Sequence, residues 1–126
     1  MSAEHALADA LADEFFGALE DGSVQGVLRC FAPDAIIWHN FDGVRLSPSD
    51  NVPGLEALFL NFVRREYRDV RRQPTPSGFV QQHILRLETK EGQVIDWPAC
   101  IVFEIDGGKI VRLDEYVDLG QLRTEG

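Results

Sequence analysis

The chain is poor in cysteine, with only Cys30 and Cys100 in 126 residues. Both lie in apolar surroundings, where a free cysteine behaves as a small hydrophobic side chain, so we expect reduced core thiols and no disulfide. The sequence has no CxxC or HExxH motif and no cluster of histidine, cysteine and carboxylate at ligand spacing. It therefore predicts no metal site.

Long apolar runs are also missing, since none approaches the roughly 18 residues that cross a bilayer. The first residues, Met1 to His5, lack the basic and apolar segments of a signal peptide. We therefore expect a cytoplasmic protein with no membrane partner.

Basic residues are scarce: 12 Lys and Arg stand against 21 Asp and Glu, for a formal net charge of -9. A nucleic-acid partner is not expected, because its phosphates would be repelled.

What is present fits one globular domain, residues 1–126, with 44% hydrophobic residues. Ala3 to Glu20 carries apolar residues at helical spacing, and the Asp21-Gly22 pair ends that helix. Ser23 can cap a short second helix that runs through Phe31. A third helix has Pro53 in its first turn, and its apolar residues recur at i, i+3, i+4, i+7 and i+8: Leu55, Leu58, Phe59, Phe62 and Val63.

Strand patterns dominate the rest of the chain. Ala35 to His39 is a short apolar strand before the third helix. After a break at residues 74–78, three strands are predicted, at residues 79–88, 94–105 and 109–118. Pro98 inside the second of these implies a bulge or an edge position. Helices gathered on one face of an antiparallel sheet make an α+β fold, and a strongly bent sheet closed by helices makes a cone with an interior.

Five arginines, Arg64, Arg65, Arg68, Arg71 and Arg72, lie within nine residues of an acidic chain. Positive charge at the end of a helix complements the helix dipole. We therefore expect this cluster to be a solvated face at the end of the third helix.

Several local strings, and the order of elements, resemble the NTF2-like superfamily, which includes the SnoaL-like polyketide cyclases, the ketosteroid isomerases and the limonene-epoxide hydrolases. The strings are Ala18–Gly22, Leu28–Ala35, Asp106–Val111 and Glu115–Asp118, and the resemblance extends from about Ala6 to Leu122. It implies a cone-shaped, curved, mixed sheet with three helices from the N-terminal half packed on one face. These are turn and core motifs, so fold and function are argued separately.

The resemblance also implies site residues. His39 falls where ketosteroid isomerases carry a carboxylate base, and Glu115 falls where the cyclases carry a catalytic Asp. A histidine titrates near neutrality and a carboxylate can orient it, so we expect His39 and Glu115 to be the catalytic acid–base groups. We expect an apolar pocket with these substrate-binding residues: Phe15, Gln82, Ile84, Arg86, Trp97, Ala99, Leu113 and Val117. The alternatives are a structural histidine at a strand end and an exposed carboxylate at the rim.

The chain also departs from these relatives. Gln82 and Ile84 occupy the positions of the Arg and Asp that epoxide hydrolysis needs, and Phe15 and Ile101 replace the oxyanion donors of the isomerases. The leading hypothesis is a lyase, isomerase or cyclase that uses no metal or organic cofactor and acts on a small hydrophobic molecule. The alternative is a binding or dimerisation module without catalysis. We expect a homodimer in either case, formed through an outer sheet face with Val94, Cys100, Val102, His83 and Leu85.

Overall fold

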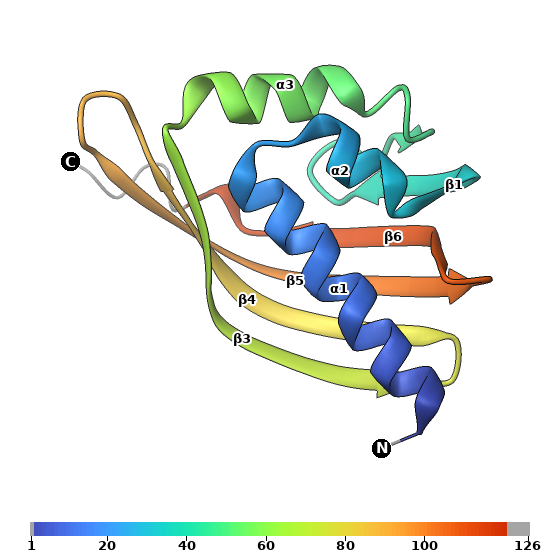
Figure 1. Cartoon of the computed structure of the whole chain (residues 1–126). Coiled ribbons are helices and arrows are strands. Elements are labelled where there is room, and N and C mark those ends of the chain that lie inside the picture. The colour runs from blue at the N-terminus through green and yellow to red at the C-terminus, as the bar shows by residue number, and fades with distance from the viewer. Residues whose placement is uncertain (1, 121–126) are drawn as a thin grey trace.

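The computed structural model describes residues 2–120, so Leu122, at the end of the resemblance, lies outside the described residues. Three helices lie on one face of a bent sheet (Figure 1). The elements are α1 (Ala3–Asp21), α2 (Val24–Arg29), β1 (Phe31–His39), β2 (Arg45–Leu46), α3 (Val52–Asn61), β3 (Arg64–Thr75), β4 (Gly78–Glu88), β5 (Val94–Asp106) and β6 (Lys109–Val117).

The six strands form one mixed sheet in the order β2-β1-β6-β5-β4-β3. β1 and β6 run parallel, and the other neighbouring pairs are antiparallel. β2 and β3 form the two edges, so the described sheet does not close into a barrel. The predicted α+β fold is confirmed, with its mixed sheet and its three helices on one face.

α1 ends at the predicted Asp21-Gly22 pair, and α2 begins after the predicted Ser23 cap. The Ser2 hydroxyl accepts a hydrogen bond from the His5 N–H at 3.1 Å, and the Ser23 hydroxyl accepts one from the Gly26 N–H at 3.0 Å. Both are N-caps that satisfy a free backbone donor. Gly22, at φ 71°, ends α1 in the left-handed region that glycine adopts without strain. α2 is shorter than predicted, because Phe31 already begins β1.

An aromatic cluster fills one end of the space between helices and sheet. Phe79 and Phe103 stack at 4.2 Å between ring centroids, and Phe15 meets Phe103 edge to face at 5.6 Å. All three rings are at most 4% exposed. Close packing of this kind contributes more than area burial alone. The space around these three rings is therefore filled.

α3 is attached more loosely than the other two helices. Leu55 is its only buried residue. The helix ends at Asn61, and Phe62 is already extended at φ -127° and ψ 129°. The predicted continuation through Val63 is therefore wrong by two residues.

The arginine cluster forms part of strand β3, so the predicted helix-terminal face is wrong. Its inward residues include Arg65, Tyr67 and Arg72, which pair with the buried Leu87, Leu85 and Gln81 of β4. The remaining arginines of the cluster lie on the outer face: Arg64, Arg68 and Arg71. The register shifts between Arg68 and Arg71, next to Asp69 at φ 53°, and this bulge turns Arg72 inward.

Pro98 lies on the interior strand β5, at the end of the β5–β6 ladder, so neither the predicted bulge nor the predicted edge position is found. It pairs with Ile84 of β4 without a bulge, whereas the pairing of β5 with β6 begins only at Ala99. The N–H of Asp118 donates to the Pro98 carbonyl at 3.0 Å. Groups of one residue point the same way in an antiparallel ladder, so the missing proline N–H faces the end of β6, and only the last bond of that ladder is forfeited.

The two cysteines are free thiols, as predicted. Cys30 is fully buried, and burial raises its pKa to about 11, helped by the nearby Glu14. Cys100 lies outside the core, on the outer face of β5 beside Gln82.

None of the described helices is both long and apolar enough to span a membrane.

Candidate functional site

A cavity of about 350 Å³ lies between the helices and the inner face of the sheet. Leu55 and Leu58 of α3 form one wall, and Ile101 and Leu113 of the sheet form another. The volume suits a small organic molecule, and such sites are usually apolar with a few polar groups. The polar groups of this cavity are therefore the place to look for chemistry.

His39 and Glu115 meet in this cavity. They are paired residues of the parallel strands β1 and β6, so their side chains leave the sheet on the same face. The His39 Nε2 lies 3.2 Å from the Glu115 Oε1, and the side chains are 17% and 20% exposed. Phe41 stacks on the imidazole at 5.0 Å with an interplanar angle of 23°. The pair is therefore oriented and partly shielded from solvent.

This arrangement suits proton transfer. A carboxylate that accepts a hydrogen bond from one ring nitrogen fixes the orientation of the imidazole and stabilises its charged form. The other ring nitrogen is then left to take a proton from a bound molecule, or to return one. Among the described residues, no group of three or more histidine, cysteine or carboxylate side chains is arranged to hold a metal ion.

Four of the eight predicted substrate-binding residues line this cavity: Phe15, Trp97, Leu113 and Val117. Ile101, also expected to face inward, lines it as well. Ala99 is on the inner face by register, because it pairs with His83 and Val117, but it does not line the cavity. The Trp97 indole N–H is buried and has no partner among the described residues.

The inward orientation predicted for Gln82, Ile84 and Arg86 is wrong. Arg86 donates two hydrogen bonds to Asp96, at 2.8 and 2.9 Å, on the outer face, and Gln82 is exposed there. Directly paired residues of neighbouring strands share a face. Because His83 pairs with Ala99 and Leu85 with Trp97, the odd-numbered residues of β4 must face inward. A shift of one residue reverses every side chain of a strand.

His83 is therefore buried on the inner face, where the sequence had placed it outside. Arg72 Nε donates to Gln81 Oε1 at 2.9 Å, which leaves the Gln81 amide nitrogen to donate to His83 Nδ1, also at 2.9 Å. The proton of the neutral ring then resides on Nε2. Burial lowers the pKa of His83 to about 4, against a smaller opposite effect of Glu115, so the ring is neutral at pH 7.

Tyr67 is one of the polar cavity residues that sequence reasoning missed, together with Asn51 and Asn61. Its ring is held edge to face by Phe16 and His83, each at 4.8 Å between centroids. Burial raises the pKa of its phenol well above the ordinary value, and the Glu115 and Glu20 carboxylates add to this effect. A strand prediction for residues 64–75 would have found it, because Arg65 and Tyr67 then share a face.

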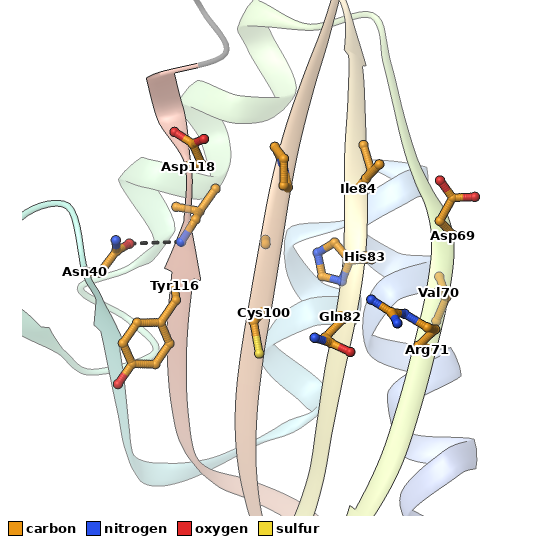
Figure 2. Close-up of a pocket in the computed structure, with 13 residues that line it drawn as sticks. Asn40, Asp69, Val70, Arg71, Gln82, His83, Ile84, Cys100, Tyr116 and Asp118 are labelled. Atoms are coloured by element: carbon orange, nitrogen blue, oxygen red, sulfur yellow. Dashed lines mark hydrogen bonds between the residues drawn. The ribbon is translucent and has the colours of Figure 1, made fainter.

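A second, larger hollow of about 1050 Å³ lies on the opposite face of the sheet (Figure 2). The helices lie behind the strands in this view, so no described element covers the hollow. Gln82 and Ile84 line it, with Asp69 and Arg71 at the β3 side and Tyr116 at the β6 side. It is an open groove on a sheet surface. The enclosed cavity with the His39–Glu115 pair is the better candidate for chemistry.

Comparison with known proteins agrees with this fold. The profile of the SnoaL-like domain family matches residues 12–113. No curated protein matches the chain. A candidate polyketide cyclase from Xanthomonas campestris pv. campestris superimposes with a TM-score of 0.83 at 17% identity, over 95% of this chain and 96% of that one.

Two further solved structures are similar. An epoxide hydrolase from M. tuberculosis, described as LEH-like, gives a TM-score of 0.76 at 18% identity, over 92% of this chain and 86% of that one. A candidate isomerase from Bacillus subtilis gives a TM-score of 0.82 at 11% identity, over 97% of this chain and 94% of that one. At such low identity these likenesses establish the NTF2-like fold alone.

Proposed function

The chain belongs to the SnoaL-like domain family, and on this premise we propose that it is a small-molecule lyase, isomerase or cyclase that works through His39 and Glu115. Its substrate is a hydrophobic carbonyl or hydroxyl compound held in the inner cavity. The observation that carries the proposal is the 3.2 Å contact between His39 Nε2 and Glu115 Oε1 in a mostly apolar cavity.

The proposed step is a proton transfer at carbon. The Nε2–H of His39 donates a hydrogen bond to Glu115. The lone pair of Nδ1 then takes a proton from the carbon next to the substrate carbonyl. The electrons of the broken C–H bond move onto the carbonyl oxygen as an enolate. Glu115 stabilises the imidazolium that forms, and His39 then returns the proton to another carbon or to a leaving hydroxyl. Isomerisation, dehydration and aldol-type cyclisation share this step.

Deuterium exchange tests the step without knowledge of the natural substrate. Neutral aryl ketones with acidic α-hydrogens are incubated with the protein in D2O, and label at the α-carbon is followed by NMR. We expect exchange above the buffer rate that falls by about 100-fold or more in His39→Gln and Glu115→Gln. His5→Gln, in the first turn of α1 and outside the inner cavity, is the matched control and keeps full exchange. Unchanged exchange in both site variants would contradict the proposal.

The second candidate is a non-catalytic module that binds a small ligand, and the enclosed apolar cavity favours it equally. It predicts that neutral aromatic ligands bind, as measured by calorimetry, while no ketone of the series acquires deuterium. The same samples therefore separate the two functions.

We also propose that the protein is a homodimer that pairs through the outer sheet face. Val94, Cys100 and Val102 lie on this face, and Tyr116 beside them is 48% exposed. His83 and Leu85, also expected there, are buried on the inner face instead. An apolar sheet surface with no described cover is a typical site of self-association.

A further inference from the structure

Tyr67 occupies a fixed position on the cavity side of β3. Its ring packs against Phe16 and His83, and its backbone N–H donates to Glu20 Oε2 at 2.9 Å. His83 itself accepts a hydrogen bond from the Gln81 side-chain amide. The phenol is thus positioned by contacts with α1 and β4 before any ligand arrives, which lowers the ordering cost of binding.

The phenol hydroxyl is available to a ligand. Within residues 2–120, no hydrogen bond of the Tyr67 hydroxyl is formed, although the residue is half-buried and lines the cavity. Four charged or titratable groups act on it or touch it: Glu115, Glu20, Arg65 and His83. Burial and the two carboxylates outweigh Arg65 and raise the pKa of the phenol, so Tyr67 keeps its proton and can donate it in a hydrogen bond.

We infer that the Tyr67 hydroxyl is the oxygen-binding donor of the site, and that it donates a hydrogen bond to the carbonyl or hydroxyl oxygen of the ligand on which His39 and Glu115 act. The inference rests on the proposed function and deepens it. A donor at this oxygen stabilises the negative charge that develops when a proton leaves the neighbouring carbon.

The other donors expected from the sequence are placed less suitably. Gln82 and Arg86 lie on the outer face. Trp97 lines the cavity, but its indole N–H is covered and cannot reach a ligand. Among the described residues that line the cavity, Tyr67 carries a hydroxyl that makes no hydrogen bond, and Glu115 lines the same cavity.

The same surroundings define the ligand class. No lysine or arginine is among the described residues that line the cavity. The Glu115 carboxylate does line it. An anionic ligand would be repelled without a compensating cation, and burying its charge would be costly. The ligand is therefore an uncharged, mostly apolar molecule with one oxygen near Tyr67.

The test uses a matched pair of neutral probes, 2-acetylnaphthalene and 2-ethylnaphthalene, which differ in the carbonyl. In the wild-type protein we expect the bound ketone to show a carbonyl infrared band shifted to lower frequency. In Tyr67→Phe the band returns toward its value in apolar solvent, and affinity for the ketone falls by about three- to tenfold. Affinity for the hydrocarbon stays the same. Tyr116→Phe, on the outer face, is the control and changes neither readout.

An unchanged carbonyl band and affinity in Tyr67→Phe would overturn the inference. Failure of both naphthalenes to bind would overturn it too, together with the neutral ligand class, while the acid–base proposal is decided separately by deuterium exchange. A third measurement needs no ligand and keeps Tyr67 intact. In Tyr116→Phe, tyrosinate absorbance reports Tyr67 alone, and ionisation at the pH of an ordinary tyrosine would contradict a buried donor beside Glu115.

Discussion

His39 Nε2 and Glu115 Oε1 lie 3.2 Å apart because their residues are direct partners in the single parallel pairing of the described sheet. The pairing is local and rigid. Asn40, which follows His39, donates its N–H to the Glu115 carbonyl at 3.0 Å, and its side-chain oxygen accepts from the Val117 N–H at 3.0 Å. The ladder therefore continues past the pair on both sides and holds the two side chains in place.

The two side chains should be energetically coupled even without ligand. Both are less than a quarter exposed, so their contact is only partly screened by solvent. We expect a double-mutant cycle of His39→Gln and Glu115→Gln to give a coupling of about 1 kcal/mol in urea unfolding at pH 6. The same cycle on His5 and Glu115 should give none. A coupling of zero for the first pair would show that the contact is not formed in solution.

His83 should make the protein acid-sensitive. Its pKa is about 4 in the folded protein, because of burial, and about 6.5 in an unfolded chain. The unfolded state therefore binds more protons between these values, and stability must fall as the pH drops from about 6.5 to about 4, by roughly 3 kcal/mol at most. Above pH 6.5 the histidine contributes no pH dependence.

Urea unfolding at closely spaced pH values checks this expectation. In His83→Gln, the loss of stability over this window should be much smaller than in the wild type, whereas in His5→Gln it should be unchanged. Equal slopes for the wild type and His83→Gln would mean that His83 is not a buried neutral histidine.

The arginines of β3 should differ sharply from one another. Arg72 contacts Gln81 and two carboxylates of α1, Asp9 at 3.0 Å and Asp13 at 3.1 Å, whereas its neighbour Arg71 is exposed on the outer face. We expect Arg72→Met to lower the free energy of unfolding by about 1–3 kcal/mol, since it leaves the buried Gln81 oxygen without a donor. Arg71→Met should stay within about 0.5 kcal/mol. Equal effects would contradict the bulge that separates the two residues.

The proposed homodimer predicts a change of mass in solution. Placing charge in the centre of an apolar interface opposes association. In sedimentation equilibrium we expect the wild-type chain to be a dimer and Val102→Glu to be a monomer with its helical circular dichroism intact. Glu104→Gln, on the same face but nearer the strand end, is the control and should remain dimeric. A monomeric wild-type chain at high concentration would remove the proposal.

The sequence predicts the structural elements correctly where one physical signal dominates. The stripe of α1 and the Asp106-Gly107-Gly108 turn are unambiguous, and both glycines of that turn do adopt positive φ, 58° and 77°. With these elements and a family resemblance in place, His39 and Glu115 could be predicted to meet. Their 3.2 Å contact bears out that geometric expectation.

The sequence was insufficient where two signals conflicted. β3 has few apolar residues and follows a strong helical pattern, so its arginines resemble the charged end of a helix. In β4, both faces carry apolar side chains, Val80 and Ile84 outside and Leu85 and Leu87 inside. Alternation alone could not choose the buried face. The choice depends on the pairing of β4 with β5, which is a tertiary property.

The loose attachment of α3 has a consequence for how such a chain can diverge. Leu55 is its only buried residue, yet Leu58, Gly54 and Ala57 of the same helix also line the cavity. Apart from Leu55, these α3 residues are thus not part of the buried core. Substitutions in α3 can alter which molecule is accepted while the cost to folding stays small. One scaffold can thereby acquire new selectivities through neutral steps.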